Sequence, residues 1–383
     1  MTAPDVLVVG AGPAGSVAAL ALARAGVRVR LIDRAAFPRP KLCGDTVNPG
    51  ALSIVDRLGV GAAVRARAEP ITGMLVTGPG GVAVAADYPG GLRGAAIERR
   101  DFDGLLLEAA VAAGVEFLPG VRALAPLIAG TPPHVVGVRV RTACGESVWP
   151  ARLVIAAEGR QSRLGAALGL TRAAASPRRW AFGAYFTGID GLTGRGEMHV
   201  RRDRYVGIAP LGGGLANVCV VRPLRGPACG DAPAVIAHAV AGDPALGPRF
   251  ARARRESVVV SLGPLAVDAT SAGCPGLLLA GDAAGFVDPM TGDGLRFALR
   301  GGELAAEAAL VELATGRPAH ASLRAACRRE FTSKWRFNRA LRALVGSPRG
   351  VALAAALGAC WGAPFRLLVN AAGDIDLVGV RPR

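Results

Sequence analysis

The stretch from residue 1 to residue 33 constrains the fold of this chain more than any other. An apolar run, Val6 to Val9, leads into glycines at the spacing Gly-x-Gly-x-x-Gly, and an alanine-rich stretch to Ala25 follows. A second apolar run, Val27 to Ile32, then ends on an acidic residue. This order predicts a strand, a tight turn, a helix and a second strand, which is the first unit of an α/β domain with a parallel sheet.

The glycines and the acid have distinct expected roles in binding a dinucleotide in a Rossmann-type unit. Gly10 would allow the tight turn, Gly12 would let backbone amides approach a pyrophosphate, and Gly15 would let the helix pack against the strand. The phosphates would lie at the helix N-terminus, where unpaired N–H groups favour an anion, and Asp33 would accept hydrogen bonds from a ribose diol. The alternative is an ordinary glycine-rich turn, but the strand, the helix and the spacing of the acid all favour the dinucleotide. We expect the cofactor to contact these residues of the unit: Gly10, Gly12, Pro13, Ala14, Gly15, Asp33 and Arg34.

Charge and composition limit the classes of partner. Basic residues number 45 against 29 acidic ones, for a formal net charge of +16, and only Lys41 and Lys334 are lysines. The arginines are scattered and aromatic residues make up only 5% of the chain, so we expect no binding of nucleic acid. Attraction to an anionic membrane surface or to a phosphorylated, acidic substrate stays open. With 51% hydrophobic and 19% charged residues, the 383-residue chain predicts one large or two modest folded domains.

Cysteine usage and hydropathy predict a cytoplasmic protein, either soluble or peripheral to a membrane. The seven cysteines are an odd number without a Cys-x-x-Cys pair, which argues against a disulfide framework and against a structural zinc site, so we expect no metal. The chain enters its first strand almost at once, so we expect no signal peptide. The longest apolar run near the C-terminus, Val351 to Trp361, is interrupted by Gly358 and is far shorter than the ~20 residues of a membrane span.

Two later segments repeat the pattern of an apolar strand that runs into a glycine and a carboxylate. They are Leu153 to Ala157 with Glu158-Gly159, and Gly276 to Ala280 with Gly281-Asp282. Such turns face ligands at the carboxyl edge of a parallel sheet. A plain strand-to-helix turn is the alternative for Glu158.

Between and after these segments the pattern changes to that of an antiparallel sheet. Residues 74–77 and 82–85 predict a hairpin, and alternating runs follow between Trp180 and Leu265 with one helical stretch. The strand-helix pattern resumes only after this insertion, so the first domain must be discontinuous. We expect a cofactor domain of residues 1–70, 97–175 and 266–318, a substrate-binding β-sheet domain of residues 71–96 and 176–265, and a helical C-terminal segment over 319–383. The basic helices of that last segment would form a solvated cover over the core, with membrane contact as the alternative.

Four segments together resemble the flavoprotein superfamily that contains p-hydroxybenzoate hydroxylase, flavin halogenases and geranylgeranyl reductases. They are residues 10–15 with Asp33, 99–103, 158–162 and 281–294. The resemblance implies FAD in the glycine-rich site and an α/β fold: a Rossmann-type FAD-binding domain of the glutathione-reductase-like kind, an inserted antiparallel β-sheet domain for substrate, and a helical C-terminus. One departure is Glu158, where the superfamily usually has aspartate.

The resemblance also assigns cofactor contacts beyond the first unit. Arg99 would lie along the cofactor and Asp282 would bind the ribityl chain. Residues of the last segment would pass beside the isoalloxazine, with the following helix N-terminus facing N1 and O2, where a reduced flavin carries negative charge. The further residues expected at the cofactor are Cys43, Gly44, Arg99, Gly281, Asp282, Pro289, Gly292, Asp293 and Gly294.

Within the superfamily the loop from Phe37 to Asp45 resembles the geranylgeranyl reductase branch, in which a Cys-Gly pair reaches the flavin. Halogenases match poorly, because the chain has no WxWxIP motif and no lysine in the hairpin region. The branch also has a YxWxFP motif that lines the substrate cavity. Its counterpart here begins at Tyr205 and ends at Pro210, with small residues at the two bulky positions. The resemblance therefore implies substrate contacts at Tyr205, Gly207, Ala209 and Pro210.

These observations predict an FAD-dependent oxidoreductase that reduces a C=C bond of a hydrophobic isoprenoid or polyketide-like molecule. Cys43 and Asp45 are the expected catalytic residues. A thiol with a pKa near 8.5 is mostly protonated at neutral pH and suits a proton donor to the carbon opposite the hydride, although Cys43 could instead only fill space. No second Gly-x-Gly-x-x-Gly follows a strand, so NAD(P)H would bind transiently or a reductase or other electron-donor protein would deliver electrons.

Two other functions stay open from the sequence. A flavin-dependent monooxygenase would hydroxylate or epoxidise an aromatic, polyketide or isoprenoid substrate, and the cofactor carries the difficult chemistry in both enzymes. A non-catalytic flavin-binding scaffold is disfavoured, because the residues expected around the isoalloxazine accompany the nucleotide-binding residues.

Overall fold

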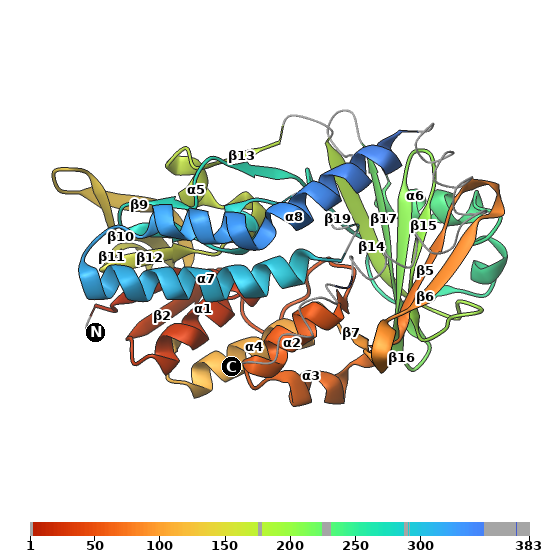
Figure 1. Cartoon of the computed structure of the whole chain (residues 1–383), viewed down its shortest axis with the longest axis horizontal. Helices are drawn as coiled ribbons and strands as arrows, with labels where there is room; N and C mark the ends of the chain where they lie inside the picture. Colours follow the sequence, from red (N-terminus) through yellow and green to blue (C-terminus); the bar gives the residue numbers. More distant parts are fainter. Residues whose placement is uncertain are drawn as a thin grey trace.

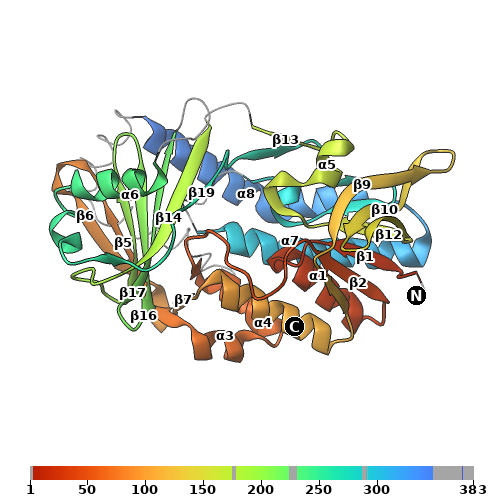
Figure 2. The same ribbon diagram turned by 180° about the vertical axis from the view of Figure 1, so that it is seen from behind.

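The computed structural model describes residues 3–174, 178–223, 231–286, 290, 292–347 and 373. Figures 1 and 2 show an elongated molecule with a layered α/β region at one end and a large β-sheet at the other. The fold class predicted from the sequence, an α/β flavoprotein fold with an added antiparallel sheet and a C-terminal helix, is confirmed.

The α/β region is built on a six-stranded sheet in the order β21-β22-β12-β1-β2-β8. Every neighbouring pair is parallel except β21 and β22. Strands β2 and β8 follow β1 on one side, and β12 and β22 come later in the chain on its other side. The strand order therefore reverses between β1 and β12, and such sheets bind ligands at the carboxyl ends of the strands at this point. The strands are β1 (Val6–Val9), β2 (Val29–Asp33), β8 (Glu116–Pro119), β12 (Leu153–Ala156), β21 (Gly273–Cys274) and β22 (Leu277–Leu279).

The two faces of this sheet bury alternate side chains against different layers. Val6 and Val8 of β1 face a core of helices, whereas Leu7 and Val9 face a three-stranded antiparallel sheet. That sheet consists of β9 (Arg122–Ala129), β10 (His134–Thr142) and β11 (Gly145–Pro150). On the other side α1 packs against both α7 and α4, and α8 packs against α7. The helices are α1 (Pro13–Arg24), α2 (Pro49–Arg57), α3 (Gly61–Arg67), α4 (Arg99–Ala112), α5 (Arg163–Ala167), α7 (Gly294–Thr315) and α8 (His320–Gly346).

The second large sheet has eight strands in the order β18-β14-β17-β16-β15-β5-β6, with β19 also paired to β14. Its hairpin β5–β6 comes from before α4 and pairs with β15, which lies far later in the sequence, in the one parallel contact of this sheet. Helix α6 (Ala232–Ala241) covers its outer face. The strands are β5 (Gly73–Thr77), β6 (Ala83–Asp87), β14 (Arg179–Thr187), β15 (Arg195–Val200), β16 (Tyr205–Gly212), β17 (Leu215–Pro223), β18 (Arg254–Arg255) and β19 (Val260–Leu262).

Two small sheets and α8 join the large sheets. One small sheet orders its strands β3 (Thr46–Val47), β7 (Gly94–Ala96) and β4 (Glu69–Ile71), and the other pairs β13 (Thr171–Ala173) with β20 (Val267–Ala269). Helix α8 extends from the α/β region toward β14 and β19 in both views. In the described part of the chain no helix is both long enough and apolar enough to span a bilayer.

The structure differs from the sequence-based prediction mainly in the meander that covers the parallel sheet. Strand β9 was not predicted from the sequence, and Pro126 pairs with Val138 inside its ladder. The apolar run from Val351 to Trp361 lies outside the described residues. The expected domain limits stay a prediction, although strands from both expected segments form the eight-stranded sheet.

Candidate functional site

A cavity of about 700 Å³ runs from the switch point of the parallel sheet to one face of the eight-stranded sheet. Its lining includes Gly10 and Asp282 at the first end and Gly207 and Met198 at the second. Most of the residues that the sequence assigned to cofactor and substrate therefore border one continuous space.

The glycine-rich turn brings helix α1 close to the ends of β1 and β12. A Cβ added to Gly15 would lie 1.8 Å from the Gly10 carbonyl oxygen, so only glycine permits this contact. Gly10 has φ +103°, and a Cβ there would lie 2.4 Å from the Ala157 carbonyl oxygen. Gly12, Pro13 and Ala14 line the cavity at the start of the helix, whose first amides have no partner within the helix, so this wall suits a pyrophosphate. Gly15 does not line the cavity and instead fixes the packing.

Asp33 links the end of β2 to the glycine-rich turn. Its Oδ2 accepts a hydrogen bond from the Ala11 amide at 2.8 Å, and its Oδ1 accepts one from the Ala35 amide at 2.9 Å. Asp33 and Arg34 both line the cavity. A carboxylate oxygen can accept more than one hydrogen bond, so Asp33 can hold the turn in place and still accept a ribose hydroxyl.

The two later turns contribute differently to the cavity wall. Gly281 and Asp282 line the cavity beside the α1 N-terminus, and their contacts to a ribityl chain stay a prediction. Glu158 also lines it, but its carboxylate accepts hydrogen bonds from the Ser162 hydroxyl and from the Leu164 amide at 2.7 and 3.2 Å. Glu158 therefore caps the start of α5. Its side chain is one methylene longer than the aspartate usual at this position, and its carboxylate still binds the first residues of that helix.

The last cofactor segment splits between the cavity and the helical core. Gly292 and Gly294 line the cavity, and Pro289 lies outside the described residues. Asp293 does not line the cavity: it is 1% exposed, and its carboxylate contacts the Asn48 amide at 3.3 Å and the Lys334 ammonium at 3.1 Å.

This placement gives Asp293 and Lys334 structural roles in the described fold. Asp293 also accepts a hydrogen bond from the Asn338 amide at 3.2 Å, so it joins the N-terminus of α7 to α2 and α8. Lys334, one of two lysines, is buried, whereas the neighbouring arginines of α8 expected on its basic face are exposed: Arg324, Arg328, Arg329, Arg336 and Arg339.

Cations gather along the cofactor end of the cavity. Arg99 is buried and makes a bidentate pair with Asp103, at 2.8 and 2.9 Å, and the Arg39 guanidinium lies 3.4 Å from the same carboxylate. Burial and the nearby Arg99 charge lower the pKa of Lys41, although Asp282 acts in the opposite direction. Arg39, Lys41 and Arg99 all line the cavity, which makes this end attractive to an anionic cofactor.

The floor at the other end is apolar and built from in-register residues of the eight-stranded sheet. One row across four strands contains Val76, Met198, Gly207 and Cys219. All of them line the cavity, and a Cβ added to Gly207 would meet nothing closer than 3.9 Å, so this position leaves free space. Tyr205 and Ala209 line the same floor, whereas Pro210 is buried and does not.

Methionine is concentrated at this cavity. The chain has four methionines, and the three that lie within the described residues all line the cavity: Met74, Met198 and Met290. Methionine side chains are flexible and polarisable and adapt to irregular apolar ligands. The floor therefore fits a hydrophobic substrate without a charged group.

The same sheet face becomes polar toward β14 and β17, where it holds the Cys43 loop. The Tyr185 hydroxyl donates to Asp45 Oδ2 at 2.8 Å, and the Asn217 amide donates to the same oxygen at 2.6 Å. Asn217 also donates to the Cys43 carbonyl oxygen at 3.0 Å, and the Cys219 thiol donates to that carbonyl at 3.1 Å. These contacts fix the Cys43 backbone, and Cys43 and Gly44 line the cavity.

Asp45 itself lies behind the cavity wall. It is fully buried, does not line the cavity, and its backbone has φ +53°, an unusual value for a residue other than glycine. Burial raises the pKa of Asp45 to about 7, even though Tyr185, Asn217 and the Arg99 charge oppose the rise.

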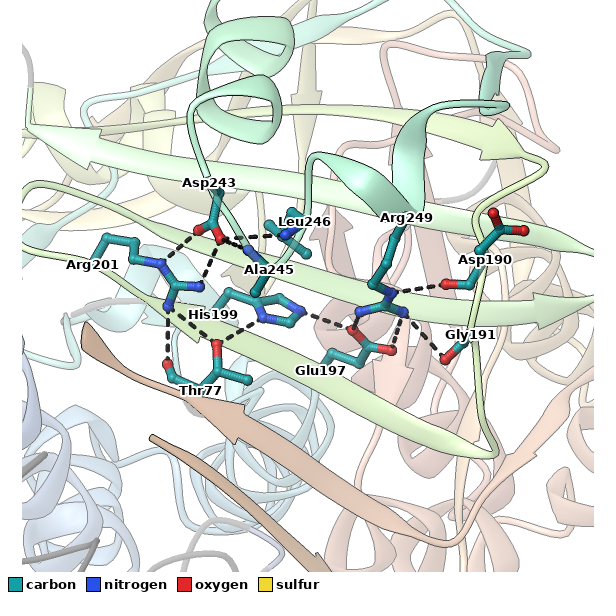
Figure 3. Close-up of polar contacts among 10 residues, drawn as sticks. All are labelled: Thr77, Asp190, Gly191, Glu197, His199, Arg201, Asp243, Ala245, Leu246 and Arg249. Carbon is teal, nitrogen blue, oxygen red and sulfur yellow. Dashed lines mark hydrogen bonds and ion pairs between the residues drawn. The ribbon is translucent and has the colours of Figure 1, made fainter. Parts of the chain in front are cut away.

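A second polar cluster lies on the outer face of this sheet, shown in Figure 3. The His199 ring contacts the Thr77 hydroxyl through Nδ1 and the Glu197 carboxylate through Nε2, both at 2.8 Å. Arg249 binds Glu197 through two nitrogens, at 2.7 and 2.8 Å, and Arg201 donates to Thr77 Oγ1 at 3.1 Å. A neutral His199 with its proton on Nε2 satisfies every one of these contacts, because Thr77 then donates to Nδ1 and accepts from Arg201.

This outer cluster continues to the segment after α6. Arg201 binds both oxygens of Asp243, at 2.5 and 3.0 Å, and Asp243 accepts hydrogen bonds from the Ala245 and Leu246 amides. Two arginines face two carboxylates, so the charges balance. The cluster therefore fixes strand β15, whose other face contributes Met198 to the cavity floor.

Sequence reasoning missed the three sheet residues that hold the Cys43 loop. Asn217 and Cys219 are polar residues two positions apart in an apolar strand, which places them on one face and was the available signal. Tyr185 pairs with Asn217 across the sheet, but nothing local in the sequence indicates that it contacts Asp45.

Comparison with known proteins agrees with the geometry. Residues 3–191 match the family described as FAD binding domain. Digeranylgeranylglycerophospholipid reductase 2 from Methanopyrus kandleri is 35% identical over 315 residues, covering 80% of this chain and 76% of the relative. Menaquinone reductase from Mycobacterium tuberculosis is 32% identical over 338 residues, covering 79% of this chain and 76% of the relative.

Solved structures show how widely the fold is used. A geranylgeranyl bacteriochlorophyll reductase-like protein from Thermoplasma acidophilum aligns with TM-score 0.80 at 21% identity, covering 99% of this chain and 95% of that one. A myxobacterial chondrochloren halogenase aligns with TM-score 0.81 at 25% identity, covering 90% of this chain and 82% of that one. Fold alone therefore does not separate reduction from halogenation.

Proposed function

This chain belongs to the geranylgeranyl reductase family of FAD-dependent oxidoreductases, and on that premise we propose that it adds two hydrogen atoms across a C=C bond of a hydrophobic isoprenoid or polyketide-like molecule. The names of the relatives support the isoprenoid class, since they include reductases of geranylgeranyl chains and of menaquinone. The apolar, methionine-rich floor supports a substrate without charge at its reacting end.

One observation carries the proposal furthest: Cys43 lies in the cavity wall together with residues of both the cofactor end and the apolar floor. Asn217 and Cys219 of the floor sheet hold its carbonyl oxygen, and Arg99 of the cofactor end contributes to the charge around its thiol. A group at this junction is placed between the two molecules that must meet.

FAD, when bound, supplies the hydride that the reaction needs. The residues of the chain then have three tasks. The glycine-rich turn, Asp33 and Asp282 hold the cofactor, the floor beneath Tyr205 orients the alkene and excludes water, and Cys43 holds a proton at Sγ for the second carbon. Asp45, the other residue predicted to be catalytic, does not border the cavity and would act through Cys43.

The source of electrons is part of the proposal. The sequence has a single Gly-x-Gly-x-x-Gly turn after a strand, which supports transient binding of NAD(P)H or delivery by a donor protein. The exposed arginines of α8 offer a basic face to such an acidic protein or to an anionic membrane surface. Steady-state turnover with NADPH, with NADH, and with dithionite as a chemical donor separates these routes.

A product assay tests the proposed reaction. The purified holoprotein is reduced with dithionite without oxygen, and a geranylgeranyl phospholipid is added before products are weighed by mass spectrometry. A gain of two hydrogens supports reduction. A product that gains one oxygen atom, and only after air is admitted, would instead identify a monooxygenase.

A further inference from the structure

Both hydrogen-bond donors at Asp45 bind one of its two oxygens. Tyr185 and Asn217 both donate to Oδ2, while the buried Oδ1 has no hydrogen-bond partner in the described structure. A carboxylate would spread donors over both oxygens, whereas a neutral carboxylic acid accepts at its C=O and keeps its O–H free to donate. The arrangement is that of an acid with its proton on Oδ1.

No cation makes direct contact with this carboxyl group in the described structure. The charge of Arg99 acts on it, but the Arg99 guanidinium forms the bidentate pair with Asp103. A fully buried, unpaired carboxylate is costly, and a positive φ at a residue other than glycine adds strain. A buried carboxyl group that lowers the stability of the fold in this way, beside a cavity, indicates a functional group.

We propose that Asp45 is the proton reservoir of the reductive reaction, resupplying Cys43 after each turnover, and that Tyr185 and Asn217 are the residues that position it. This inference rests on the proposed reduction. One alkene carbon takes the hydride; the other takes H⁺ from the Cys43 thiol and leaves a thiolate. The thiolate then takes the Asp45 proton, and the Asp45 carboxylate regains a proton from solvent, so the substrate gains two hydrogens in all.

The groups that face Asp45 set the pH range in which it can serve. They are Tyr185 from β14, Asn217 and Cys219 from β17, and Arg99 and Glu98 at the start of α4. Tyr185 and Cys219 also interact with Cys43, two residues before Asp45 in the same loop. Burial raises the pKa of Asp45 to about 7, and the hydrogen bonds from Tyr185 and Asn217 lower it. Removing either donor therefore moves the pH at which the proton is lost upward.

The test compares the wild type, Asp45→Asn and Tyr185→Phe in repeated turnovers of the dithionite-driven holoenzyme with a geranylgeranyl phospholipid, from pH 5 to pH 9. We expect the wild-type rate to fall above about pH 7, Asp45→Asn to be about 100-fold slower with no such fall, and Tyr185→Phe to keep the fall but at higher pH. A readout independent of activity is the pH dependence of unfolding, which Asp45→Asn should flatten between pH 4 and pH 7.

The outcomes separate this inference from the proposed function. If the wild type forms the reduced product and Asp45→Asn has the same rate and pH profile, Asp45 is not the proton reservoir, whereas the proposed reduction is supported. If the wild type forms no reduced product at any pH, the proposed function fails and the reservoir fails with it. Intact flavin absorbance in each variant shows that the site is folded.

Discussion

The two faces of the eight-stranded sheet carry two buried polar clusters, which differ in how completely their carboxyl groups are paired. On the outer face, Glu197 and Asp243 are paired with arginines, and His199 contacts Glu197 and Thr77. None of these three side chains has a buried polar atom without a partner in the described part of the chain. On the cavity face, Asp45 has a free oxygen and no paired cation in the described structure. A complete network stabilises and orients a strand, whereas an incomplete one keeps a proton available beside the cavity.

The largest expected effect breaks the complete cluster. Glu197→Gln leaves the Arg249 guanidinium and His199 without their anion, and removing one partner of a buried ion pair costs roughly 3 to 5 kcal/mol. The free energy of unfolding from denaturant titration measures this. Asp190→Asn is the control, because Asp190 and Arg252 form an exposed pair and its loss should cost less than about 1 kcal/mol. Equal losses in the two variants would refute a special role for the outer cluster.

The two clusters should also respond to pH in opposite directions. Asp45 has a folded pKa of about 7, above its unfolded value, so the folded state loses stability as pH rises from about 4 to 7, by up to roughly 4 kcal/mol. Burial raises the pKa of Glu197, but Arg249 and His199 lower it further than burial raises it, so its contribution is lost only as pH falls below its usual range. Unfolding curves from pH 3 to pH 8 for the wild type, Asp45→Asn and Glu197→Gln separate the two responses. A wild-type stability that does not change between pH 4 and pH 7 would contradict the state assigned to Asp45.

Cofactor affinity gives a smaller effect away from both clusters. Asp282→Ala removes a charged acceptor expected at the ribityl chain, worth about 1.5 to 3 kcal/mol, so FAD should bind roughly 10- to 100-fold more weakly. Asp33→Ala should act similarly at the ribose and also loosen the turn that it holds. Equilibrium dialysis of FAD measures both. Asp293→Asn tests the placement of that residue, since it should alter stability more than FAD affinity.

The smallest effect tests the thiol of Cys43 with two substitutions. Cys43→Ser nearly keeps the volume of the side chain but weakens the acid, whereas Cys43→Ala removes the proton, so alanine should slow single-turnover reduction more than serine. FAD content and dithionite reduction should be unchanged in both variants. Equal rates for the wild type, serine and alanine would remove Cys43 from proton transfer.

The sequence predicted what depends on local spacing and missed what depends on distant contacts. Gly10, Asp33 and Asp282 all line the cavity, because a strand and a tight turn fix their positions within a few residues, and their cofactor contacts stay a prediction. Asp293 was expected at the cofactor because of its neighbours, yet Lys334, some forty positions later, draws its carboxylate into the core.

The cluster around Asp45 shows the same limit more sharply. Tyr185 and Asn217 lie 140 and 172 positions from Asp45, so their contacts exist only once the inserted sheet has folded against the Cys43 loop. The loop was recognisable from the sequence, but the residues that set its proton chemistry were not.

The most direct test measures one rate in two isosteric variants, one for each face of the sheet. Reduction of a geranylgeranyl phospholipid by the holoprotein is followed over two successive turnovers, with excess dithionite to supply the electrons of the second turnover, and is normalised to bound flavin at a temperature where both variants are folded. The account predicts that Asp45→Asn loses about 100-fold in the second turnover while keeping its stability, and that Glu197→Gln loses stability while keeping its rate within a few-fold. Unchanged second turnover in Asp45→Asn, or a rate lost equally in both variants, would contradict the division of the two faces into a functional and a structural cluster.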